Sequence, residues 1–213
     1  MVIPPGAPPE LTLVVQRFAE TTRGIVSFHL HWTMDVHAGF SGRHEDRLIV
    51  GISDDGAIVK VRVLSYTIDG KAAGDAAQAA LEQGYEHPKP GDLFNAPFDP
   101  RYLGEYQYQS SGPQKIVFTS NLRDAAHGNG SMSYDAADNV VDYTYQPNAL
   151  PPHASSAEVT DRRTEVLPGY WAVTQETQQY KGSYGPFPGA GTVQSTFSDF
   201  RRFADLQSAL RAI

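Results

Sequence analysis

This chain has 213 residues, of which 40% are hydrophobic and 19% are charged, and it contains no cysteine. That composition supplies a packed core and excludes disulfide bonds, thiolate metal sites and cysteine nucleophiles. The net charge of −7 gives no basic footprint for nucleic acid and disfavours anionic membrane surfaces. No apolar run is long enough for a transmembrane helix. A β-rich chain of this length commonly forms one unit, so we expect a single domain over residues 1–213.

The N-terminal region predicts a Pro-rich lead-in, residues 1–8, followed by a short helix. The lead-in lacks the charged and apolar segments of a signal peptide, so we expect a protein that is either cytoplasmic or exported with its signal peptide absent from this sequence. Residues 9–22 have four apolar side chains at the spacing of one helix face: Leu11, Val14, Val15 and Phe18. We expect this amphipathic helix to pack on a sheet.

Strict alternation over residues 27–37 predicts a long β-strand with one apolar and one polar face. The apolar parity consists of Phe28, Leu30, Trp32, Met34 and Val36. After a turn at residues 39–43, a returning strand is expected over residues 46–53. The sequence Asp54-Asp55-Gly56 then favours a tight hairpin, because Asp and Gly tolerate positive φ.

Residues 57–68 continue the meander, with Val59, Val61 and Val63 expected on one face. An Ala-rich, helix-prone stretch over residues 71–83 and a Pro-rich stretch over residues 84–100 interrupt the sheet. Long structured excursions are often functional, so residues 71–100 are a candidate cover. The remaining strands are expected over residues 102–109, 114–122, 130–134, 140–146, 156–164, 170–180 and 192–202, before a short helix at residues 204–213. Residues 182–191 are Gly- and Pro-rich and are typical of a hairpin loop.

Two enzymatic alternatives stay open at this point. His29 and His31 lie two residues apart on one strand face, about 7 Å between Cα atoms, which allows them to share a Zn²⁺ or Cu²⁺ ion. His153, in the Pro-rich turn of residues 146–156, is a candidate catalytic histidine. No nucleophile elbow and no phosphate-binding loop accompanies either alternative. A solvated or hydrogen-bonded strand face is the preferred interpretation of His29 and His31.

The sequence also resembles the bacterial periplasmic lipoprotein-carrier superfamily, which includes LolA/LolB-like and RseB N-terminal-like proteins. The likeness is carried by residues 11–22, by the strand of residues 27–37 and by the Asp69-Gly70-Lys71 turn. It implies a curved, incompletely closed barrel with helices on its concave side, which holds acyl chains or another apolar ligand. It also implies a periplasmic or otherwise exported protein with no catalytic residues and no cofactor.

Together these observations predict a mainly β protein with flanking helices (α+β), in which a long curved antiparallel meander sheet forms an incomplete barrel. The expected function is non-enzymatic binding of an apolar small molecule, a lipid or a lipidated protein. The residues expected to line the ligand are Phe28, Leu30, Trp32, Met34, Val36, Val59, Val61, Val63, Phe118 and Tyr143. The alternatives are a metal-dependent secreted enzyme that uses His29 and His31, and a sensory or structural protein-interaction module whose core is filled.

Overall fold

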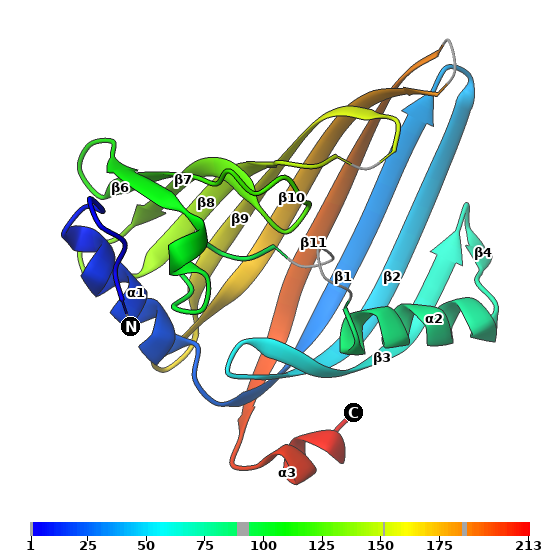
Figure 1. Cartoon of the computed structure of the whole chain (residues 1–213). Helices are drawn as coiled ribbons and strands as arrows, with labels where there is room; N and C mark the ends of the chain where they lie inside the picture. The colour runs from blue at the N-terminus through cyan, green and yellow to red at the C-terminus, as the bar shows by residue number, and fades with distance from the viewer. Residues whose placement is uncertain (1, 89–93, 151, 185–186) are drawn as a thin grey trace.

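The computed structural model describes residues 2–88, 94–150, 152–184 and 187–213, and its centre is one open antiparallel sheet. Eleven strands follow the order β4-β3-β2-β1-β11-β10-β9-β8-β7-β6-β5. The sheet does not close and curves around the face that carries the helices, as Figure 1 shows. The predicted fold class is therefore confirmed.

The strands differ greatly in length. Those of the middle of the sheet are long, and those near its edges are short. Their bounds are β1 Ile25–Ala38, β2 Ser41–Asp54, β3 Ala57–Ile68, β4 Lys71–Ala72, β5 Gln107–Ser110, β6 Lys115–Thr119, β7 Gly128–Tyr134, β8 Val140–Pro147, β9 Ala154–Leu167, β10 Tyr170–Tyr184 and β11 Phe187–Phe203.

Strand β1 lies inside the sheet, between β2 and the last strand β11. Its partners run from Ile25 opposite Phe203 to Ala38 opposite Gly189, so the first and the last strand pair with each other in the interior of the sheet. The two sheet edges, β4 and β5, are consecutive strands in the sequence. The excursion between them therefore connects one open edge to the other, across the helix-bearing face (Figure 1).

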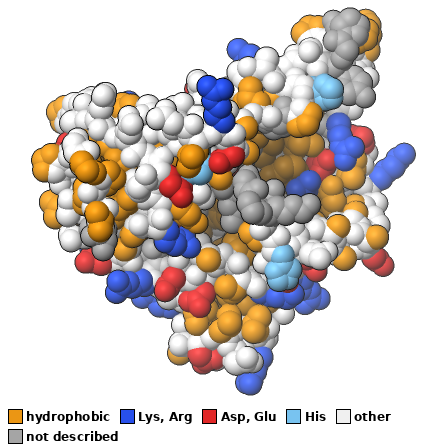
Figure 2. Space-filling model, in the orientation of Figure 1, with side chains coloured by type: hydrophobic (Ala, Val, Ile, Leu, Met, Phe, Trp, Pro, Cys, Tyr) orange, Lys and Arg blue, Asp and Glu red, His pale blue; other side chains and the backbone are white. Residues whose placement is uncertain are grey.

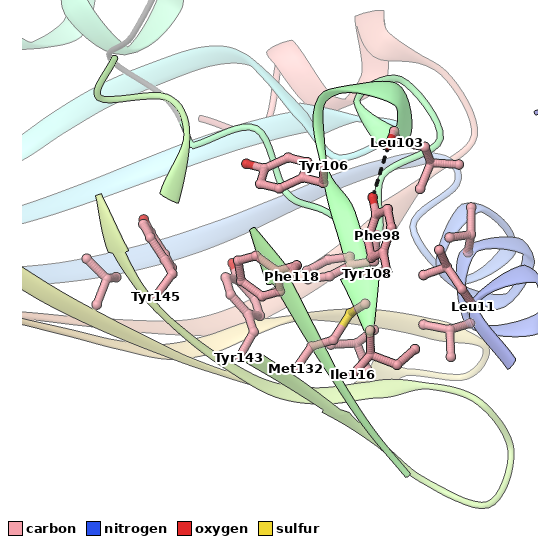
Figure 3. Close-up of a cluster of buried hydrophobic side chains, with 14 residues drawn as sticks. Leu11, Phe98, Leu103, Tyr106, Tyr108, Ile116, Phe118, Met132, Tyr143 and Tyr145 are labelled. Carbon is pink, nitrogen blue, oxygen red and sulfur yellow. Dashed lines mark hydrogen bonds between the residues drawn. The ribbon is translucent and has the colours of Figure 1, made fainter. Parts of the chain in front are cut away.

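Two core clusters occupy this face. In the first, which we call the α1 core, helix α1 (Glu10–Thr21) packs on β5 to β9, as Figure 3 shows. The α1 core consists of Leu11, Val14, Val15, Phe98, Leu103, Tyr106, Tyr108, Ile116, Phe118, Met132, Val140, Tyr143, Tyr145 and Val159. The second, the α2 core, packs Leu81 and Tyr85 of helix α2 (Asp75–Glu86) against Phe28, Leu30, Ile49, Val61, Val63 and Tyr66.

A β-bulge overturns one prediction about strand β3. The pairing steps from Ile52–Lys60 to Ser53–Ile58, which leaves Val59 as the extra residue. Ile58 then packs against the α2 core, whereas Val59 is 37% exposed. The prediction that Val59 shares a face with Val61 and Val63 is wrong, because alternation holds only while the ladder is regular.

Three further predictions needed correction. The turn expected at residues 39–43 is shorter, since β2 already begins at Ser41. Residues 102–109 contain a 3₁₀ helix, Leu103–Glu105, before the short strand β5. Residues 182–191 are mostly strand, because β10 and β11 remain paired to Tyr184 and Phe187. The C-terminal helix is confirmed as α3, Leu206–Leu210. Residues 89–93 of the excursion lie outside the described residues.

Helix α2 also supplies hydrogen-bond partners to the edge of the sheet. Strand β4 pairs only with Thr67 and Ile68, so it leaves most of β3 uncovered. The backbone N–H of Val63 donates to Glu82 Oε1 at 2.7 Å, and that of Val61 donates to Glu86 Oε1 at 3.3 Å. These carboxylates shield an edge that would otherwise be open to pairing with another chain.

We predict that Glu82→Ala makes the Val63 amide exchange its hydrogen roughly tenfold faster, since removal of a charged acceptor costs about 1.4 kcal/mol. Amide exchange followed by NMR measures this change. Gln83→Ala, an exposed position on the same helix, is the matched control and should leave the rate unchanged. Equal protection of Val63 in both variants would contradict the role of α2 at this edge.

Candidate functional site

A cavity of about 850 Å³ lies on the concave face beside the α2 core, between the ends of β1, β2, β9, β10 and β11. Figure 2 shows a hollow with hydrophobic side chains on this face of the molecule. The volume falls in the range of small-molecule sites, about 300–1,000 Å³. The large apolar side chains of its wall are Trp32, Met34, Val36, Pro152, Phe187 and Val193.

Glycines help to leave this space unfilled. After Val193, the next cavity-facing positions of β11 are Gly191 and Gly189, opposite Val36 and Ala38 of β1. A β carbon at Gly191 would lie 3.1 Å from Val36 Cγ2, which places that position on the cavity side of the strand. Because neither glycine carries a side chain, β11 forms a wall here without filling the interior.

Trp32 marks the inner end of the cavity, where it also packs against the α2 core. The Arg47 guanidinium lies 3.7 Å from the centroid of the Trp32 ring and 4.8 Å from that of Tyr66. Cation–π contacts of this kind hold both partners in place when they are partly desolvated. Arg47 thus fixes the orientation of Trp32 at the inner end of the cavity.

Glu45 holds this cation in turn. Its carboxylate is buried and accepts hydrogen bonds from Arg47 Nη2 at 2.6 Å, Tyr66 Oη at 2.8 Å and Arg43 Nε at 2.8 Å. Burial opposes ionisation, but these three donors hold the pKa of Glu45 below its ordinary value. The cluster therefore remains charged and internally paired at neutral pH.

A second polar cluster lies between the two cores on the same face. Asp161 of β9 is opposite Glu176 of β10, and Asp161 is only 2% exposed. Burial first and then the nearby Glu176 charge raise the pKa of Asp161 to about 8, against the opposing effects of a hydrogen bond from Tyr143 and the charge of Arg163. Burial also raises the pKa of Glu176.

Hydrogen bonds link this acidic pair to the cavity wall. Gln178 Nε2 donates to Glu176 Oε1 at 2.7 Å, and the Tyr180 hydroxyl donates to Gln178 Oε1. Gln178 and Tyr180 both line the cavity, whereas Glu176 lies behind them, where Ser195 Oγ donates to it at 3.3 Å. Gln178 and Tyr180 thus form a polar strip of the cavity wall that is hydrogen-bonded within the protein, and Arg43 and Lys181 add charged side chains to the lining.

The structure distributes the ten residues expected to line a ligand among four settings. Trp32, Met34 and Val36 line the cavity. Phe28, Leu30, Val61 and Val63 are buried in the α2 core, and Phe118 and Tyr143 are buried in the α1 core. Val59 is exposed through its bulge. Ligand contact stays a prediction, and the geometry now directs it to the first three.

Several cavity residues were not expected from the sequence: Pro152, Gln178, Tyr180, Phe187, Gly189, Gly191 and Val193. Three of them, Phe187, Gly189 and Gly191, belong to the stretch of residues 182–191, whose glycines and prolines are typical of a loop. One sequence signal could have identified Gln178 and Tyr180. Together with Glu176 they alternate along the predicted strand of residues 170–180, so their side chains point to the same face of the sheet.

The two histidines of the metal alternative lie on the opposite, outer face of β1. His29 Nδ1 is 3.4 Å from Asp199 Oδ2, and His31 Nε2 is 3.1 Å from Asp46 Oδ2. Within the described ranges, no group of three or more His, Cys, Asp or Glu side chains is placed to hold a metal ion. The paired polar face accounts for both residues, and the metal-enzyme alternative is not favoured.

Comparison with known proteins finds likeness in shape only. No protein-family model matches the chain, and no curated protein sequence matches it. Among solved structures, a domain described as an outer membrane lipoprotein-sorting protein from Vibrio parahaemolyticus is similar at a TM-score of 0.46, with 11% identity over 92% of both chains. A DUF1329 family protein from Desulfovibrio piger is similar at a TM-score of 0.31, with 11% identity over 94% of both chains.

A third structure, the MucA/MucB complex of Pseudomonas aeruginosa, is similar at a TM-score of 0.25, with 11% identity over 92% of this chain and 100% of that one. A lipoprotein-sorting domain and MucB are thus among the solved structures that this chain is similar to in shape. In the described part of the chain, no helix is long and apolar enough to cross a membrane.

We predict that the buried acidic pair makes stability fall as pH rises. The native pKa of about 8 for Asp161 exceeds the ordinary 3.8, so the native protein binds more protons than the unfolded chain between those values. The stabilisation is fully present below about pH 4 and is lost as pH rises through about 8. Asp161→Asn removes the titration, so its Tm relative to the wild type should increase from pH 5 to pH 9.

Thermal unfolding followed by circular dichroism over this pH range measures the difference. Asp142→Asn is the matched control, since Asp142 lies on the neighbouring strand at a position adjacent to Tyr143 and therefore on the outer face. Its curve should run parallel to that of the wild type. Parallel curves for Asp161→Asn as well would show that Asp161 is ionised in the native protein.

Proposed function

We propose that this protein binds an apolar ligand, either a lipid or the acyl chain of a lipoprotein, and catalyses no reaction on it. The observation that supports this proposal is the cavity of about 850 Å³ on the concave face, with Trp32, Met34 and Val36 in its wall. Two tightly packed cores lie on the same face, so the space beside them is a local feature of the sheet and not loose packing throughout.

The energetics suit a hydrocarbon chain. Each CH₂ group moved from water into such a cavity gains about 0.8 kcal/mol, so a chain of several carbons reaches useful affinity through burial alone. The polar strip of Gln178 and Tyr180 is already hydrogen-bonded within the protein, so an apolar ligand need not satisfy it. A strongly polar ligand would lose its hydration against the apolar wall of Trp32, Met34 and Val36.

We further propose that residues 71–100 act as the cover of the concave face. Helix α2 packs on β3 through the α2 core. Beyond it, Phe94 stacks on Tyr145 with ring centroids 3.6 Å apart, and Phe98 is buried in the α1 core. The excursion is thus attached at both ends to opposite halves of the sheet. That arrangement suits a segment that limits access to the space between them.

The proposal includes a location in the cell envelope, carried over from the resemblance to exported carriers. The cell envelope contains apolar ligands such as lipids and lipidated proteins. A groove that is open on one side can accept a ligand of this class. A protein-interaction module with a filled core, the rival reading, would not need an apolar cavity of this size.

We predict saturable binding of a dansylated fatty acid, and a loss of at least about tenfold in affinity on Met34→Asp. A carboxylate in the cavity must be desolvated when the ligand enters, which opposes binding. Probe fluorescence, followed by displacement with unlabelled fatty acids of increasing length, measures the affinity. It should rise with chain length until the cavity is full.

Thr33→Asp is the matched control, because it adds the same charge one residue along the same strand, on the outer face. It should bind the probe as the wild type does, and circular dichroism should show both variants folded. Absence of saturable binding in the wild type, or equal binding by Met34→Asp and Thr33→Asp, would overturn the proposed site.

A further inference from the structure

Two neighbouring hairpins form an apolar tip at one end of the sheet. The β1–β2 hairpin turns at Gly39 and Phe40, and β11 begins beside it at Phe187 (Figure 1). A β carbon at Gly39 would lie 3.0 Å from the Phe187 ring, so the two hairpins are in contact. Phe40 is 104% exposed and Phe187 is 48% exposed. Two aromatic rings presented together to solvent are costly unless something covers them.

The charge of this tip differs from that of the rest of the chain. The whole protein carries 24 acidic and 17 basic side chains. The described stretches that build the tip and the adjoining cavity wall, residues 36–44, 152–157, 177–184 and 187–198, contain Arg43 and Lys181 but no Asp or Glu. The overall negative charge therefore says little about what this end attracts, because charges beyond about 10 Å are screened at physiological salt.

The acidic groups nearest to the tip are occupied. Asp35 contacts His44 at 2.8 Å, between Asp35 Oδ1 and His44 Nδ1. Glu45 is buried and already holds Arg43 and Arg47. The Arg43 side chain as a whole nevertheless remains 53% exposed, so it can also contact a further anion. An exposed aromatic pair with two cations beside it, whose nearest carboxylates are held by His44, Arg43 and Arg47, is complementary to an anionic, partly apolar surface.

The tip and the cavity are continuous. Val36, Arg43, Lys181 and Phe187 belong both to the tip and to the lining of the cavity. A surface that contacts the tip would therefore also face the outer end of the cavity. An apolar molecule would pass between that surface and the cavity along a path lined by Phe187, Val36 and Met34, with little exposure to water.

We propose that this tip docks on the surface of a phospholipid bilayer that contains anionic lipids. The rings of Phe40 and Phe187 enter the boundary between headgroups and acyl chains, and Arg43 and Lys181 lie against lipid phosphates. The net charge of the whole chain gives the opposite expectation, that anionic membranes are disfavoured, because it averages over the local charges of the tip. The docking inference goes beyond the ligand-binding proposal and does not depend on it, because Phe40 does not line the cavity.

Co-sedimentation with vesicles tests the docking. The wild type should bind vesicles of equal parts phosphatidylglycerol and phosphatidylcholine, bind pure phosphatidylcholine more weakly, and lose the difference at high salt. Phe40→Ser should lower the bound fraction on the mixed vesicles at least about fivefold, because its apolar ring no longer enters the interface. Phe40→Trp should retain binding, and its added emission should shift to the blue on vesicles.

Leu64→Ser is the matched control, since Leu64 is an exposed apolar residue on β3, away from the tip, and should leave binding unchanged. Met34→Asp should still sediment with vesicles although it fails to bind the fatty-acid probe, and Phe40→Ser should bind the probe normally. This pair of results separates docking from ligand binding.

Two outcomes would overturn the proposal. One is equal vesicle binding by the wild type and Phe40→Ser. The other is a concentration-dependent dimer in analytical ultracentrifugation that Phe40→Ser abolishes, without any binding of the wild type to vesicles. The second outcome would assign the aromatic tip to contact with another copy of this chain.

Discussion

The architecture depends on a mismatch of length between strands and helices on one apolar sheet face. Strands β1 and β2 have 14 residues each and β11 has 17, whereas α1 and α2 have 12 each. A strand of 14 residues spans roughly 46 Å, and a helix of 12 residues spans roughly 18 Å. The helices therefore cover only part of the face that the long strands present, and the cavity lies where that cover ends.

The alternation at residues 27–37 made this face predictable from the sequence. Its apolar parity became the covered side of β1, and its polar parity became an outer face on which His29 and His31 pair with carboxylates. Periodicity identified the face because backbone geometry fixes it locally. Periodicity could not show which part of the face is packed and which is open, since that depends on where the helices and the excursion end.

Two local features also escaped prediction for physical reasons. The bulge at Val59 is a property of the hydrogen-bond ladder between two strands, so the sequence of β3 alone does not reveal it. The glycines of residues 182–191 were read as a loop because glycine weakens an isolated strand. In the sheet these residues are held by the neighbouring strands β1 and β10, and their missing side chains become the space of the cavity.

The charged side chains of the concave face differ in ionisation from place to place, and these differences determine which ligands the face can bind. The Asp161–Glu176 pair lies between the cores, where burial favours the protonated form of both carboxyl groups. Glu45, by contrast, stays ionised because three donors surround it. The cavity end carries the cations Arg43 and Lys181, and the carboxylate that holds Arg43, that of Glu45, is buried, although the chain as a whole is acidic. An apolar interior with a cationic rim suits an amphipathic ligand whose headgroup is anionic.

The central claim is that the cavity, and not the cores, takes up an apolar molecule. Methyl NMR of the methionines tests it most directly, because Met34 lines the cavity and Met132 is fully buried in the α1 core. Titration with dodecanoate should shift the Met34 methyl signal saturably and leave the Met132 signal in place. A Met34 signal that does not respond, or equal shifts at both methyl groups, would contradict the account.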